Sequence, residues 1–294
     1  MNTMRYLLLS LLVITSLSSC DIVNAPKGDM ASPTPPGGST VTRNVLLEDC
    51  TGFRCNNCPD AAIRAMQLKA IYGDRLVVVG VHMLDEFAKP VEPLDDGFYD
   101  TDFRTPAGNT YQSQGGFDIT ALPIGLVNRK PYNGSIRVSR YSWSTAVAGM
   151  IDQQAALDLR IDTLIFDSVA GTVSGGVSAV LLQPLATPHN LTLYLTEDHV
   201  IDWQLNNQAN PHDVPNYDHR HVLRGALNGT WGEGFLDAST QVGDTVHLTF
   251  SHPLPPAPAT VLEPNNCALV AYVYSTSGSD KYEVKQVVER EFQP

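Results

Sequence analysis

The feature that most constrains the fold is a Cys-x-x-Cys-Pro motif, Cys55–Pro59, placed between two patterned segments. The segment Val45–Asp49 precedes it and begins with the apolar run Val45-Leu46-Leu47, which predicts a strand. The segment Pro59–Tyr72 follows with helical periodicity, and the β-branched run Leu76–His82 is typical of a strand buried on both faces of a parallel sheet. Strand, helix and strand over this length predict a right-handed βαβ unit, with the motif at the turn from strand to helix.

This placement gives the two cysteines different expected roles. Unpaired N–H groups at a helix start stabilise a thiolate, so Cys55 is expected there as the more exposed, attacking thiol. Cys58, one turn into the helix, would attack a mixed disulfide formed on Cys55. Because both strands of a βαβ unit end at the same edge, His82 is also expected near the cysteines. It could tune a thiolate there, but a hydrogen-bonded histidine at the end of a strand is the preferred interpretation.

Residues 1–20 have the pattern of an export signal. Arg5 gives a positive start, and Leu7–Leu17 is an apolar core too short to span a bilayer comfortably. The ending Leu17-Ser-Ser-Cys20 resembles a bacterial lipobox, which implies cleavage before Cys20 and acylation of Cys20; the alternative is an ordinary signal peptide cut nearby. Residues 21–42 are rich in Pro, Gly and Ser, which predicts a flexible tether.

Charge and cysteine content narrow the function further. With 31 acidic against 19 basic residues, the formal net charge of −12 argues against nucleic acid and against electrostatic docking on anionic lipid. An exported chain meets an oxidising compartment, where Cys55 and Cys58 are a natural disulfide pair. Cys50 and Cys267 could bond across a domain interface, or each could be a small buried residue, and the second is preferred because both lie in strand-like runs. No cofactor is predicted.

From about Leu157 the apolar periodicity changes to two. About seven alternating segments, separated by Gly, Pro, Asn and Asp turns, predict an antiparallel sandwich of immunoglobulin-like type over residues 158–294. Residues 43–157 would form the preceding α/β domain, closed by a helix over Ser144–Leu157.

The segment His212–His221 of the second half carries the strongest metal signal in the chain. His219 and His221 would share one face of a strand, as metal ligands can. No third ligand has a fixed spacing from them, so a polar strand edge is the preferred interpretation and no metal is predicted.

A third element completes a family pattern. Leu122-Pro123 leads into an apolar run that ends at Asn128, and with the strand, the motif and the helix it resembles the thioredoxin fold. The resemblance implies a cis-proline at Pro123 that lies against the cysteines and shapes a substrate groove. It also implies a buried acid that aids proton transfer at Cys58, at Asp49 by spacing, with Glu48 as the alternative. Arg54 replaces the usual aromatic residue, and the Asn-Asn dipeptide gives no redox direction.

A narrower resemblance covers most of the chain. Residues 47–59, 122–129 and 219–232 are together similar to the outer-membrane-protein-28-related lipoproteins of Bacteroidetes. This similarity implies a lipoprotein signal, a thioredoxin-like domain and then a β domain. It also implies a place in the cell envelope, as an outer-membrane lipoprotein held through the lipid on Cys20 and facing the periplasm or the surface.

Two functional hypotheses follow. The first, slightly favoured, is thiol–disulfide exchange on envelope proteins through Cys55 and Cys58. The second is a non-catalytic surface binding or adhesion lipoprotein, in which the thioredoxin-like unit is a scaffold and the β domain meets a partner. A structural zinc at the cysteines is less well supported, because only two thiolates are close in sequence.

Overall fold

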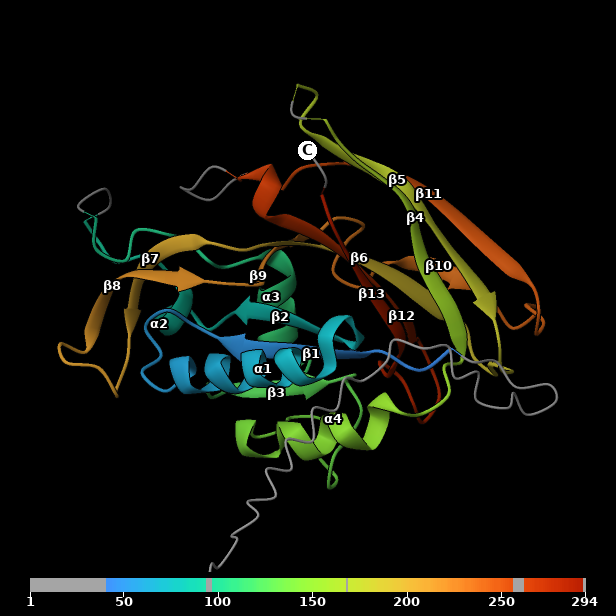
Figure 1. Ribbon diagram of the computed structural model, residues 1–294, viewed down its shortest axis with the longest axis horizontal. Helices are drawn as coiled ribbons and strands as arrows, with labels where there is room; N and C mark the ends of the chain where they lie inside the picture. The colour runs from blue at the N-terminus through green and yellow to red at the C-terminus, as the bar shows by residue number, and fades with distance from the viewer. Residues whose placement is uncertain (1–40, 94–96, 168, 256–261, 293–294) are drawn as a thin grey trace, which may run out of the picture. The chain divides into compact units, whose positions relative to one another are not determined.

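The computed structural model describes residues 41–93, 97–167, 169–255 and 262–292 (Figure 1). The predicted export signal, the proposed lipidation site at Cys20 and nearly all of the tether lie outside the described residues. Among the residues described, no helix is both long enough and apolar enough to cross a membrane.

The elements alternate first between strand and helix and then become almost entirely strands. The helices are α1 (Cys58–Tyr72), α2 (Asp85–Ala88), α3 (Pro106–Gln112) and α4 (Trp143–Ile151). The strands are β1 (Val45–Thr51), β2 (Leu76–His82), β3 (Ile124–Val127), β4 (Leu157–Asp167), β5 (Thr172–Leu181), β6 (His189–Glu197), β7 (Val200–Leu205), β8 (Asp213–His219), β9 (Val222–Ala226), β10 (Glu233–Leu236), β11 (Thr245–Pro253), β12 (Cys267–Ser275) and β13 (Val284–Glu291).

The βαβ unit predicted around the motif is present as β1, α1 and β2. β1 pairs with β2 in parallel from Val45 opposite Leu76 to Thr51 opposite His82. β3 pairs antiparallel with the other side of β1, with Ile124 opposite Cys50. The end of β1, the end of β2 and the start of β3 therefore meet at one edge, where the cysteine loop leaves the sheet.

Alternation along β1 distributes its side chains between two layers. Val45 and Leu47 pack in a core with apolar residues of α1 and α4, whereas Leu46 and Cys50 pack on the opposite face with α3. The buried sheet thus has helices on both faces, as a parallel pair of this composition requires.

The large sheet continues from these strands into the second half of the chain, in the order β13-β12-β6-β9-β2-β1-β3, with β10 paired to β6. The junction is a parallel pairing of Gly80 in β2 with Val222 in β9. One core also combines residues of both halves, such as Val79 with Tyr272. The predicted division at residues 157 and 158 stays a prediction, although this sheet and this core extend across it.

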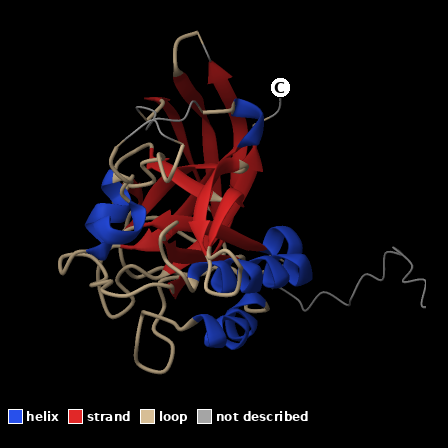
Figure 2. Ribbon diagram, turned by 90° about the vertical axis from the view of Figure 1, so that its left-hand side faces the viewer, coloured by secondary structure: helices blue, strands red, loops and turns tan. Residues whose placement is uncertain are grey.

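A smaller sheet of three strands, β11-β5-β4, shares a second core with β6, β10 and β12. Leu269, Ala271 and Val273 of β12 point into this core, whereas Val270 and Tyr272 point into the core shared with α3. The second half therefore contains two facing sheets, as a sandwich does, but one of them belongs to the large sheet. The fold is β-rich with few helices, as Figure 2 shows.

β7 and β8 pair with each other as a two-stranded hairpin apart from both larger sheets. It follows β6 directly and is drawn at the left of Figure 1. The sequence analysis did not predict this hairpin, which covers the cysteine loop as described below.

Candidate functional site

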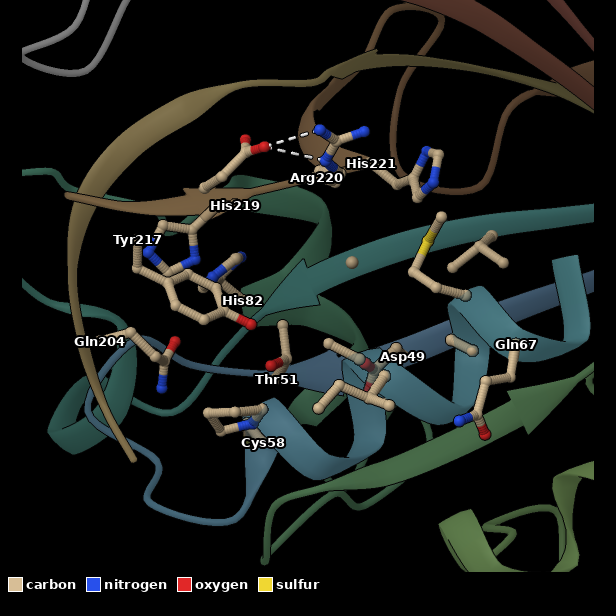
Figure 3. A pocket seen from close by; sticks show the side chains of 18 of the residues that line it. Asp49, Thr51, Cys58, Gln67, His82, Gln204, Tyr217, His219, Arg220 and His221 are labelled. Atoms are coloured by element: carbon tan, nitrogen blue, oxygen red, sulfur yellow. Dashed lines mark hydrogen bonds and ion pairs between the residues drawn. The ribbon is translucent and has the colours of Figure 1, made fainter. Parts of the chain in front are cut away.

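A cavity of about 440 Å³, called the α1 cavity here, lies at the edge where β1 and β2 end. Its floor includes Asp49 and Thr51 of β1 and His82 of β2. Residues of α1 line one side, and Tyr217 and His219 of β8 line the other (Figure 3). Cys58 lies at one end of the cavity, at the start of α1.

Cys55 and Cys58 form the predicted disulfide. Only 3% of the surface of Cys55 and 1% of that of Cys58 is exposed. Cys55 is the more exposed of the two, as expected, but both residues are buried in this structure. The role of Cys55 as the attacking thiol stays a prediction. The helix position is also different, because α1 begins at Cys58 with Asn57 as its N-cap residue, and Cys55 precedes it.

The β7–β8 hairpin is hydrogen-bonded to the backbone of the buried cysteine loop. The amide of Gln204 donates hydrogen bonds to the carbonyl oxygens of Cys55, at 3.1 Å, and Gly52, at 3.4 Å. Backbone N–H groups of Leu205 and Asn207 donate to the carbonyl oxygens of Phe53 and Asn56 at 2.8 and 2.9 Å. The end of β7 and the residues just after it thus hold the cysteine loop by its backbone.

The two candidate acids occupy opposite faces of β1, because neighbouring side chains of a strand alternate. Glu48 points into the core with α3, where Arg129 binds it through two contacts of 2.7 Å. Asp49 points toward α1 and lines the cavity together with Cys58. The acid on the disulfide side is therefore Asp49, and Glu48 belongs to a buried ion pair.

The Asp49 carboxyl group is 4% exposed, and its Oδ1 atom has no hydrogen-bond partner among the described residues. Burial raises the pKa of Asp49 to about 7, against the opposing effect of the positive charge on Arg140. A carboxyl group that titrates near neutral pH beside a disulfide is suited to proton transfer, and it is also suited to binding a hydrogen-bond donor.

His82 lies on the cavity floor, as the βαβ geometry predicted. Its ring stacks on Phe103 at 4.3 Å and meets the edge of His219 at 5.6 Å between ring centroids. Burial lowers the pKa of His82 well below its usual value and that of His219 to about 4, so both rings are neutral at physiological pH. His82 Nδ1 has no hydrogen-bond partner in the described part of the chain. The preferred interpretation of the sequence was a hydrogen-bonded histidine at the end of a strand.

His219 and His221, the pair considered as metal ligands in the sequence, do not share a strand. β8 ends at His219, whereas His221 lies in the turn before β9 with a positive φ of 53°. Residues 41–93, 97–167, 169–255 and 262–292 contain no group of three or more His, Cys, Asp or Glu side chains that could hold a metal ion.

Pro123 directly precedes β3, and the Leu122–Pro123 peptide bond is cis. The register of β3 with β1 places it at the end of β1 from which the cysteine loop departs. Pro123 is not among the residues that line the α1 cavity.

Cys50 and Cys267 are both free and buried, as the preferred interpretation had it. Burial raises the pKa of the Cys267 thiol to about 12 and that of Cys50 well above its usual value. Both thiols therefore stay protonated and unreactive at neutral pH.

The sequence analysis missed the wall that α1 contributes to the cavity. Ala62, Met66 and Ala70 are four residues apart and line it, as does Ile63, which is 53% exposed. The signal was present in the sequence, because apolar residues of α1 extend beyond the stripe that faces the core.

Comparisons with known proteins agree with this fold. HBP35 of Porphyromonas gingivalis superposes with a TM-score of 0.60 over 87% of this chain and 76% of that chain, at 17% sequence identity, which shows a shared fold. A domain of the outer membrane lipoprotein Omp28 from Porphyromonas gingivalis has 20% identity over 48% of this chain and 90% of its own, but its TM-score of 0.32 is too low for a structural conclusion. The search of curated proteins gave no match.

The model of the family described as outer membrane protein Omp28 matches residues 109–293. The match begins within α3, so it includes all of the second half of the chain but not the Cys-x-x-Cys motif. Because it spans more than half of the sequence, the chain belongs to the Omp28 family, whose place is the outer membrane of the cell envelope.

Proposed function

We propose that this protein is a lipid-anchored binding protein of the outer membrane, in which a thioredoxin-like unit serves as scaffold and the α1 cavity receives a ligand. The lipid on Cys20 would hold it to the membrane through the tether of residues 21–42. The observation that carries the proposal is the burial of Cys55, at 3% exposure, in a loop that the β7–β8 hairpin holds by hydrogen bonds. A disulfide buried in this way does not meet a protein substrate, whereas the adjacent cavity of about 440 Å³ has the size of a ligand site.

The thioredoxin-like assignment is supported by the strand order β2-β1-β3, by helices on both faces and by the motif between β1 and α1. In this proposal the Cys55–Cys58 bond is structural. It fixes the loop at the start of α1 and so shapes the end of the cavity that Cys58 lines. The β7–β8 hairpin of the second half supplies the opposite wall, through β8.

Thiol–disulfide exchange is the second candidate, and one observation favours it: Asp49, with a pKa raised to about 7 by burial, shares the cavity with Cys58. A partner thiolate would attack Cys55 and release Cys58 as a thiolate, which takes a proton from Asp49. The second thiol of the partner would then resolve the mixed disulfide. Two electrons would pass from the partner dithiol to the protein, leaving Cys55 and Cys58 reduced. This route requires displacement of the β7–β8 hairpin.

Resistance to reduction separates the two candidates. For a structural disulfide, we expect dithiothreitol to reduce Cys55–Cys58 at least about tenfold more slowly in the native protein than in the urea-unfolded protein, because attack must await local opening. Mass spectrometry after alkylation with iodoacetamide measures the rate. Gln204→Ala should speed reduction of the native protein, since it removes the amide that holds the cysteine loop at the carbonyl oxygen of Cys55.

An insulin-reduction assay gives the functional readout. The binding proposal expects equal turnover by the wild type and by Cys55→Ser. Faster turnover by the wild type, lowered again by Asp49→Asn, would establish exchange and end the structural assignment of the disulfide.

A further inference from the structure

The α1 cavity has an apolar wall that no part of the described chain covers fully. Ala62, Met66 and Ala70 face it at intervals of four residues, and such residues lie on one side of a helix. Ile63 continues the wall and is 53% exposed. An exposed apolar strip along a helix, beside a cavity, suits an extended apolar group of a ligand.

The floor of the cavity is polar and incompletely satisfied. Asp49 Oδ1 and His82 Nδ1 are buried and have no hydrogen-bond partner among the described residues, and each of the two residues is 4% exposed. Leaving a buried polar atom without a partner destabilises the folded protein. An ionised carboxylate only accepts hydrogen bonds, so a ligand that satisfies Asp49 should have a donor at one end.

The charges around the cavity favour a cation at that end. Of the charged residues that line it, Arg220 is bound to Asp218 at 2.8 Å, whereas Asp49 has no cation in hydrogen-bond contact among the described residues. The positive charge that opposes the rise in the pKa of Asp49 is that of Arg140. The guanidinium of Arg140 is held by Asp60 at 2.6 Å, and Arg140 does not line the cavity. His82 and His219 are neutral. A formal net charge of −12 attracts cations to the molecule as a whole.

We propose that the α1 cavity binds a cationic amphiphile, with an ammonium group on Asp49 and a straight apolar chain along Ala62, Met66 and Ala70 of α1. This inference rests on the proposed binding function and specifies its ligand class. The ammonium group supplies several donors for the floor, and the apolar chain covers the exposed strip of the helix.

Three probes that share one alkyl chain test the ligand class: octylamine, octanol and octanoate. They are titrated by calorimetry into the full chain carrying Cys20→Ser, so that neither an acyl group nor detergent competes for the cavity. We expect octylamine to bind at least about tenfold more tightly than the other two, because a hydrogen bond to a charged group is the stronger kind. Asp49→Asn should remove this preference, and Ala62→Trp, which fills the cavity from the helix surface, should abolish binding.

Asp152→Asn is the matched control, because Asp152 is exposed, carries the same charge and lies outside the cavity. It should leave the affinity for octylamine unchanged. Equal or tighter binding of octanol or octanoate, lost in Ala62→Trp, would overturn the cationic class while leaving the binding function intact. Binding of none of the three probes would also overturn the class. The proposed binding function is tested by a different experiment, the insulin-reduction assay. A failure of the ligand class in these titrations can therefore be told apart from a failure of the proposed function.

Discussion

Replacing Arg129 by methionine is expected to lower the free energy of unfolding by about 3–5 kcal/mol, because it leaves the Glu48 carboxylate buried without its partner. The Arg129 side chain is 0% exposed and that of Glu48 is 1% exposed. Two hydrogen bonds of 2.7 Å join them, and Arg129 also donates to the hydroxyl oxygens of Tyr194 and Tyr272 at 2.8 and 2.9 Å. Its guanidinium lies 4.7 Å from the ring centroid of Tyr111.

These hydrogen bonds join four parts of the chain: Glu48 belongs to β1, Arg129 follows β3, Tyr194 belongs to β6 and Tyr272 belongs to β12. Loss of Arg129 should therefore weaken the packing of the first half of the chain on the second. Urea denaturation measures the change, and Arg160→Met, at an exposed ion pair with Asp158, should cost far less. The double variant Glu48→Leu, Arg129→Met should recover much of the loss, since it removes both charges. Equal losses in Arg129→Met and Arg160→Met would contradict the role given to the buried pair.

Local patterns predicted the elements around the motif well. The run Leu76–His82 has the bounds of β2, and the helix predicted over Pro59–Tyr72 begins one residue earlier, at Cys58. Both segments have an unambiguous period and are bounded by residues that end an element, such as Gly73. The helix predicted over Ser144–Leu157 ends at Ile151 instead, because Leu157 already pairs with Leu181 as the first residue of β4.

The burial of Cys55 could not be predicted from its surroundings in the sequence. The groups that cover it come from Gln204 to Asn207, at the end of β7 and just after it, and this contact is purely tertiary. β8 also gives a weak strand signal, because it contains Pro215 and several polar residues. Because the sequence did not predict this hairpin, the position of Cys55 beside the start of a helix favoured an exposed thiol.

The sequence distance to Cys55 also could not determine whether Asp49 or Glu48 is the acid beside the cysteines. Alternation along β1 guarantees that the two carboxyl groups face opposite sides, but it does not reveal which side receives α1. The distinction depends on Arg129, which follows β3 and binds Glu48 on the face of α3. Only the tertiary structure, in which Arg129 binds Glu48 on the other face, shows that Asp49 is the acid beside Cys58.

The second large effect concerns Asp49, whose carboxyl group is buried. Replacing Asp49 by asparagine is expected to raise the free energy of unfolding above that of the wild type, by an amount that grows as pH rises. Burial raises the pKa of Asp49 from its ordinary value of 3.8 to about 7. Between these two values the folded state holds a proton that the unfolded state has released, so the wild type loses stability as pH increases from about 4 to about 7. At about pH 8 the loss is on the order of 2–4 kcal/mol, allowing for water in the cavity.

The amide side chain introduced by Asp49→Asn never ionises, so the variant avoids this loss. The variant and the wild type should have similar free energies of unfolding near pH 4, where the carboxyl group is protonated in the folded state, and should diverge above it. Urea denaturation across this pH range measures the difference, with Asp152→Asn as the control for removing an exposed carboxylate. Parallel curves for Asp49→Asn and the wild type would mean that Asp49 ionises freely in the folded protein. The floor of the α1 cavity would then lack the buried acid on which the exchange candidate and the proposed cation site depend.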